Sequence, residues 1–108
     1  MDNQEQKERR QYERYPFRED ILIDGTKQAY SQNISEDGMF FNTLHPLKRG
    51  SVIHVTIPSN LTVKAEVNNS QPGIGIGIEF IDLNYDQKRE IKQLIEDIKL
   101  GVFKNPTQ

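Results

Sequence analysis

Residues 52–67 read VIHVTIPSNLTVKAEV, and this stretch contains two strand patterns separated by one turn. Apolar and polar side chains alternate in residues 52–57 and again in residues 61–67, so each segment directs one apolar face to one side. Pro58, Ser59 and Asn60, which lie between the two segments, are turn formers. The period of two therefore predicts a pair of β-strands with one buried face.

The sequence on both sides of this pair has the same character. Residues 21–23, 28–34, 39–43 and 74–81 are short apolar or alternating runs, and Asp24-Gly25 is a strong hairpin signal. Residues 68–73 (NNSQPG) consist entirely of turn-forming residue types, which predicts a loop there. Residues 73–77 (GIGIG) superficially look like a dinucleotide-binding loop, but strand rather than helix follows them. Six short strands predict an antiparallel barrel or sandwich.

A different periodicity begins after residue 84. Ile91, Leu94, Ile95 and Ile98 have the spacing of one helix face. Asn84 and Gln87 have the spacing of a capping box, and Gly101 is a typical residue just beyond a helix end. We therefore predict a helix over about residues 84–100, with its apolar stripe against the barrel or a partner subunit.

Composition excludes several classes of protein. The 108 residues suit one domain, and the balance of 14 basic against 16 acidic side chains, with a pI near 5.7, argues against a bulk nucleic-acid binder. The absence of cysteine excludes disulfides, zinc fingers and thiol nucleophiles. No apolar run is long enough for membrane insertion, and the polar N-terminus is not a signal peptide, so we expect a cytoplasmic protein. His45 and His54 lack metal-ligand spacing, and no catalytic constellation is present, which predicts a non-enzyme without metal or cofactor.

The first fifteen residues are almost all polar or charged, so we expect a flexible arm. Arg9, Arg10 and Arg14 lie within six positions, close to Tyr12 and Tyr15. Arginine matches phosphate oxygens with two parallel hydrogen bonds and stacks on aromatic rings. The arm can therefore grip a phosphorylated aromatic ligand, although by itself it also fits a solvated tail.

A second polar cluster lies at residues 33–38 (NISEDG). Asn33 and Ser35 are two positions apart, so we expect their side chains to point the same way, where both can donate and accept hydrogen bonds. Gly38 permits a positive φ and a close approach of the backbone to a ligand. The alternative is an ordinary Asn/Ser turn between two strands.

Together these elements resemble the PilZ domain family, bacterial receptors for the second messenger cyclic di-GMP. Residues 10–14 (RQYER) give R-x-x-x-R, residues 33–38 give [D/N]-x-S-x-x-G, and residues 75–80 (GIGIEF) resemble the closing strand of that fold. The resemblance covers about residues 8–100.

The resemblance implies an all-β fold with a C-terminal helix, a six-stranded antiparallel split β-barrel. The divisions are then residues 1–15 as the arm, 16–104 as barrel and helix, and 105–108 as a tail. It also implies a cyclic di-GMP receptor that signals to an unknown effector protein by ordering its arm. An arginine at position 9 tends to accompany an intercalated ligand dimer in this family, so we expect two ligands per protomer. The implied ligand contacts are Arg9, Arg10, Arg14, Asn33, Ser35 and Gly38.

Three alternatives stay open at this point. A PilZ-type adaptor that binds protein but no nucleotide is disfavoured because the motif residues are intact. Binding of single-stranded nucleic acid, with bases stacked on Tyr12, Tyr15, Phe40 and Phe41, is disfavoured by the acidic pI. Finally, the apolar stripe of the helix could serve in a homodimer.

Overall fold

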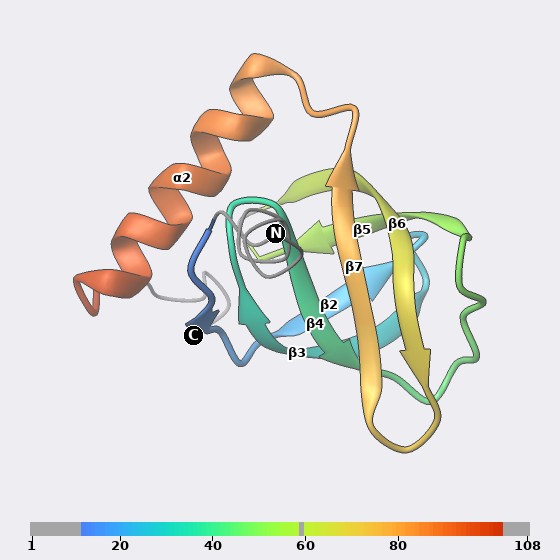
Figure 1. Cartoon of the computed structure of the whole chain (residues 1–108). Coiled ribbons are helices and arrows are strands. Elements are labelled where there is room, and N and C mark those ends of the chain that lie inside the picture. The colour runs from blue at the N-terminus through green and yellow to red at the C-terminus, as the bar shows by residue number, and fades with distance from the viewer. Residues whose placement is uncertain (1–11, 59, 103–108) are drawn as a thin grey trace, which may run out of the picture.

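In the computed structural model, residues 12–58 and 60–102 are described, and about half of them form one sheet that closes on itself (Figure 1). The strands are β1 (Tyr15–Pro16), β2 (Asp20–Ile23), β3 (Lys27–Ile34), β4 (Gly38–Asn42), β5 (Val52–Ile57), β6 (Leu61–Gln71) and β7 (Gly75–Ile81). One helix, α2 (Tyr85–Lys99), follows the last strand.

The sheet is closed because β3 pairs with both ends of the strand series. The order β2–β5–β6–β7–β4–β3 returns to β2, and every pairing is antiparallel. Within the described ranges this is a six-stranded antiparallel barrel with a C-terminal helix, which confirms the predicted fold. The short strand β1 lies outside the ring and pairs with the end of β3, where Tyr15 is opposite Ile34 and Pro16 is opposite Asn33.

The barrel core is made by the inward face of each alternating strand. In the pair β5–β6, Val55 is opposite Val63 and Ile53 is opposite Ala65, and all four side chains are buried. The period of two in residues 52–67 thus predicted the buried face correctly. The predicted hairpin at Asp24-Gly25 is also confirmed, because both residues have positive φ (52° and 77°).

Both ends of α2 have the predicted caps. The Asn84 side chain accepts a hydrogen bond from the Gln87 N–H at 2.7 Å, and the Gln87 side chain accepts one from the Asn84 N–H at 2.9 Å. At the other end Gly101 has a φ of 72° and its N–H donates to Ile98, while the Val102 N–H donates to Asp97. These bonds form the motif that typically ends a helix at glycine.

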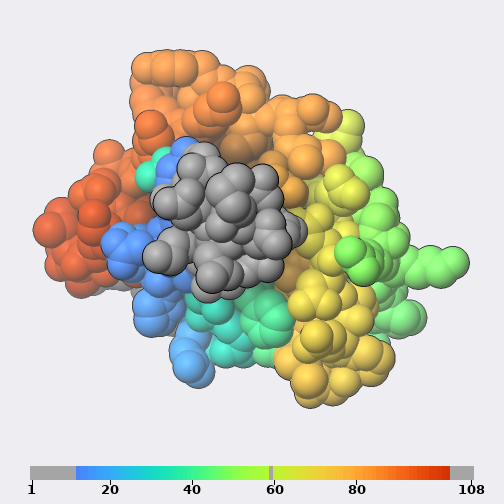
Figure 2. Space-filling view, viewed as in Figure 1, coloured from blue at the N-terminus to red at the C-terminus, as the bar shows by residue number. Residues whose placement is uncertain are grey.

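The apolar stripe of α2 is used inside the chain. Ile91, Leu94 and Ile95 are buried in the same core as the strands, and Ile98 packs on its edge. The helix lies against β1 and β6, and the Gln87 side chain donates to the Thr62 carbonyl of β6 at 3.0 Å. Figure 2 shows the blue N-terminal segment between the red helix and the teal barrel strands. The stripe therefore docks the helix and is not left for a partner subunit.

The prediction of a loop over residues 68–73 is wrong. Strand β6 continues to Gln71, with Asn69 opposite Gly77 and Gln71 opposite Gly75, and the turn is limited to residues 72–74. A β-bulge between Val67 and Asn69 shifts the register. Both faces of this extension lie beyond the core. Its residues therefore do not alternate between apolar and polar, and the pattern that predicts a strand is missing.

Strand β4 begins at Gly38, where two backbones come unusually close. A Cβ atom at this position would overlap the carbonyl oxygen of Ile78 on β7. Gly38 does not have a positive φ, so the prediction of a positive φ at this glycine is wrong. The position requires glycine because of contact between two strands of the barrel.

We expect Gly38→Ala to destabilise the barrel by about 1–3 kcal/mol, the usual cost of overpacking against a rigid neighbour. Gly77→Ala is the matched control, because a Cβ there would meet Asn69 at 3.5 Å and the Phe40 ring at 4.0 Å, which are ordinary contact distances. Urea unfolding of both variants measures the difference. Equal stabilities would show that the strands separate at little cost at Gly38.

We expect Asn84→Ala to lower the free energy of unfolding by about 1 kcal/mol, because the Gln87 N–H loses its acceptor at the helix start. Asn68→Ala serves as a control, because its amide meets only the exposed Glu79 carboxylate at 3.3 Å. A cap variant no less stable than this control would contradict the role of the capping box.

Candidate functional site

Residues from the two polar clusters of the sequence meet on the outside of the barrel. The Arg14 guanidinium donates a hydrogen bond to the Asn33 side-chain oxygen at 3.0 Å. The contact follows from the pairing of β1 with β3, which puts Pro16 opposite Asn33 and brings the residue before β1 alongside. Arg14 is exposed and Asn33 is half-buried, so both remain accessible from solvent.

Two hollows adjoin this contact, with volumes of about 570 and 310 Å³. Arg14, Asn33 and Phe40 line both of them, so the hollows form one surface that we call the Arg14 face. The first hollow is also lined by Pro16, Arg18, Gln32, Asn42 and Ile74, and the second by Asn68, Asn69, Gly77 and Ile78.

Phe40 lies at the centre of this face. Its ring packs on a part of β7 where the residues beneath it are glycines and carry no side chains. A Cβ atom on Gly75 would overlap the Phe40 ring, and one on Gly77 would also reach it. The alternating partners Ile76 and Ile78 point into the core instead. The glycine–isoleucine alternation therefore puts small residues on one face and apolar ones on the other, as predicted, and the small residues hold an aromatic ring.

The charge of the Arg14 face is entirely positive among the residues that line its hollows. Arg14 and Arg18 contribute guanidinium groups, and no lining residue is a carboxylate. The other polar groups are side-chain amides. Asn42 is held between two neighbours, because it accepts from Gln32 at 2.7 Å and donates to the Ile74 carbonyl at 2.7 Å. Cations, amides and an aromatic ring are groups that suit an anionic heterocyclic ligand.

Arg18 was missed as a candidate in the sequence analysis. It is positioned by its two neighbours: the Phe17 N–H donates to the Gln32 carbonyl at 3.0 Å, and the Glu19 N–H donates to the buried Ser31 hydroxyl at 3.0 Å. The signal was present, because residues 10, 14 and 18 repeat arginine every four positions. In an extended segment, residues separated by an even number of positions direct their side chains to the same side of the chain.

Ser35 and Gly38 line neither hollow. Ser35 is fully buried; its hydroxyl bonds to the Asp37 carboxylate, and its N–H donates to the Gly38 carbonyl at 2.9 Å. The expectation that Asn33 and Ser35 point the same way is wrong, because β3 ends at Ile34 and the chain turns. These contacts give Ser35 the turn-forming role that the sequence left as the alternative.

The tyrosines of the arm lie on the other side of β1. Tyr12 and Tyr15 line a hollow against α2, and the Lys99 ammonium lies 5.8 Å from the centre of the Tyr15 ring. The Glu96 carboxylate, 3.4 Å from that ammonium, raises the pKa of Lys99 above its ordinary value. Phe41 is fully buried in the core. Of the four aromatic residues considered for base stacking, Phe40 is thus the one that lies on the Arg14 face.

Arg9 and Arg10, the other predicted contacts, lie outside the described residues, as do most of the predicted arm and the tail at 105–108. Residues 12–58 and 60–102 contain no group of three His, Asp or Glu side chains that could hold a metal ion. The same ranges contain no helix long and apolar enough to cross a membrane.

Comparison with known protein families gives a match. The sequence pattern of the PilZ domain matches residues 8–97, which is most of the chain and includes the helix as far as Asp97. Among curated proteins, no sequence matches this chain. PilZ domains are typically binding or adaptor modules and not enzymes. The chain therefore belongs to the PilZ domain family, a family of cyclic di-GMP receptors.

Proposed function

We propose that this protein binds cyclic di-GMP on the Arg14 face and acts as a receptor for it. The observation that carries the proposal is the hydrogen bond between Arg14 and Asn33, because it joins the arm motif to the barrel motif in the wall that both hollows share. The ligand has two phosphodiester charges and two guanines, so it needs cations, base-edge partners and a stacking surface.

The chemistry of the face supports each of these requirements. Arg14 and Arg18 supply forked donors for phosphate oxygens. The amides of Asn33 and Asn69 supply donors and acceptors for a guanine edge. The Phe40 ring offers a flat surface of the kind on which nucleobases stack.

Arg9 and Arg10 complete the proposed site from the arm. We propose that they close over the ligand, and that Arg9 favours an intercalated pair with two ligands per protomer. Ordering a segment on binding costs conformational entropy, so the arm also serves as a switch. The proposed readout is a changed contact with an effector protein in the cytoplasm of a bacterium.

The second candidate is a PilZ-type adaptor that binds protein but no nucleotide. One observation favours it: Ser35 and Gly38 have structural roles in the β3–β4 turn and the β4–β7 contact. Their presence is therefore explained without a ligand, and the case for nucleotide binding depends on the arginines and on Asn33.

We expect Arg14→Ala to weaken binding of cyclic di-GMP by ~10- to 150-fold, because it removes a charge-assisted bond worth ~1.5–3 kcal/mol. Arg14→Lys should lose part of this affinity, since lysine keeps the charge but lacks the forked guanidinium group. Isothermal titration calorimetry measures affinity and stoichiometry together.

Arg89→Ala is the matched control for this experiment. Arg89 is an exposed arginine on α2 that pairs with Asp86 at 3.6 Å and lines neither hollow of the Arg14 face. Its loss should leave the affinity unchanged. If Arg14→Ala and Arg89→Ala bind equally well, the ligand is not held at Arg14; if the unaltered chain does not bind at all, the adaptor function is favoured.

Arg18→Ala tests the cation that the family motifs do not include. We expect a loss of affinity of at least ~10-fold in the same calorimetric titration, because Arg18 is the second cation of the larger hollow. An unchanged affinity would limit the site to the smaller hollow and the arm. Thermal unfolding should be unaffected, since the side chain is exposed.

A further inference from the structure

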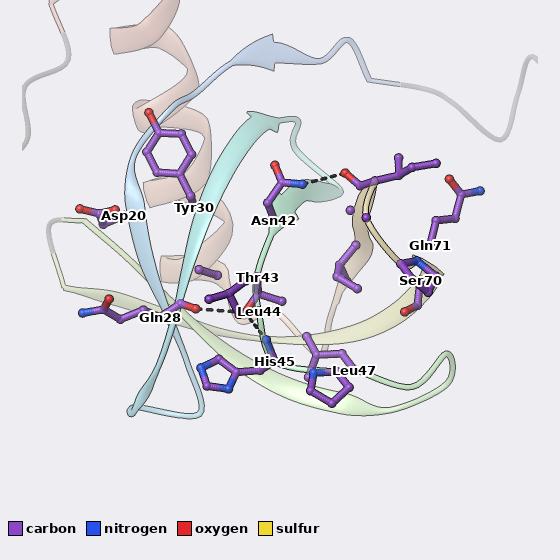
Figure 3. Close-up of a pocket in the computed structure, with 17 residues that line it drawn as sticks. Asp20, Gln28, Tyr30, Asn42, Thr43, Leu44, His45, Leu47, Ser70 and Gln71 are labelled. Carbon is purple, nitrogen blue, oxygen red and sulfur yellow. Dashed lines mark hydrogen bonds between the residues drawn. The ribbon is translucent and has the colours of Figure 1, made fainter.

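A third and larger hollow lies at the end of the barrel where β4 leaves the sheet. The β4–β7 ladder ends with Phe41 opposite Ile76, and the β3–β4 ladder ends with Tyr30 opposite Asn42. Beyond this point the Asn42 side chain, not its backbone, satisfies the Ile74 carbonyl (Figure 3). The segment after β4 and the segment before β7 separate here. A hollow of about 770 Å³ lies at this end, and we call it the barrel-end hollow.

The barrel-end hollow is apolar in its floor and at its rim. Its floor includes the core residues Ala29 and Ile76, which are 6% and 7% exposed. At the rim Leu44 is 100% exposed and Ile74 is 61% exposed. Figure 3 shows that Leu44 comes from the segment after β4, whereas Ser70 and Gln71 on the opposite wall come from the end of β6. A fully exposed leucine beside an open apolar hollow leaves much apolar surface in water.

This surface is also almost free of charge. Of its 17 lining residues, Asp20 is the one Asp, Glu, Lys or Arg, whereas such residues make up 28% of the chain. Depletion of charge is characteristic of the centre of protein interfaces. It also means that two copies of the surface can meet without repulsion between like charges.

We propose that the barrel-end hollow is a self-association surface, occupied by Leu44 of a second copy of this chain. Under twofold symmetry, a face that carries both a projection and a hollow is complementary to itself. Leu44 of each protomer then enters the hollow of the other, near Ile74 and Pro72. The inference does not depend on nucleotide binding, and its experiments use the protein without ligand.

The size of the surface indicates a small interface. A standard interface uses about 20–30 residues on each side, and 17 residues line this hollow. We therefore expect a small dimer that forms reversibly.

Sedimentation of the full chain over a range of concentrations tests the proposal. Leu44→Asp should weaken association by at least ~10-fold, because it puts a charge into the apolar centre of the interface. Leu100→Asp is the matched control, since Leu100 is 71% exposed but lies at the end of α2. Both variants should fold, because both side chains are exposed. Purely monomeric behaviour of the unaltered chain, or a loss of association in Leu100→Asp alone, would overturn the proposal.

Disulfide trapping gives a second readout, because the natural sequence has no cysteine. A mixture of Leu44→Cys and Ile74→Cys protomers should form the mixed disulfide faster than a mixture of Leu44→Cys and Leu100→Cys. Equal rates in the two mixtures would show that Leu44 of one copy does not meet the hollow of another.

Discussion

Strand β3 is paired along both of its edges near its end, and this double pairing determines where the candidate site lies. Asn33 is opposite Pro16 of β1 on one edge and opposite Phe40 of β4 on the other. A bulge between Ser31 and Asn33 sets this register. An arm residue, a barrel amide and an aromatic ring therefore meet through backbone pairing alone, before any ligand is considered. The conformational cost of bringing Arg14 to Asn33 is included in the folding of the barrel.

The sequence predicted those features that local periodicity and capping chemistry determine. The alternation in residues 52–67 gave the β5 bounds correctly, and Asn84 with Gln87 gave the start of the helix. The sequence did not predict the extension of β6 to Gln71, because that extension has no apolar face that would indicate a strand. The sequence also predicted a positive φ at Gly38, which is wrong, and it could not predict the close contact with Ile78, which joins residues 40 positions apart in the chain. For the candidate site, the sequence motifs identified Arg14 and Asn33. The position of Phe40 on the same face could not be predicted, because it depends on which strand lies against its ring.

Arg14, the residue before β1, and Tyr15, the first residue of β1, lie on two surfaces of different chemistry. Arg14 contacts the polar face through Asn33, and the next residue, Tyr15, lies against the helix beside Lys99. Because the two residues are adjacent in the chain, the Arg14 face and the packing surface of α2 lie next to each other along this segment. The helix on the second surface is fixed by its apolar stripe, which joins the barrel core.

Asn42 and Ile74 line both the Arg14 face and the barrel-end hollow, so these two surfaces share a wall. The wall is held by one side-chain amide, which accepts from Gln32 on one side and donates to the Ile74 carbonyl on the other. The Ile74 N–H also donates to the Gln71 carbonyl at 2.9 Å, so the tip of the β6–β7 hairpin has its own turn bond besides the bond to Asn42. Any coupling between two ligands is reciprocal in free energy. If occupancy of the Arg14 face changes the affinity for a partner at Ile74, that partner changes the affinity of the Arg14 face by the same factor.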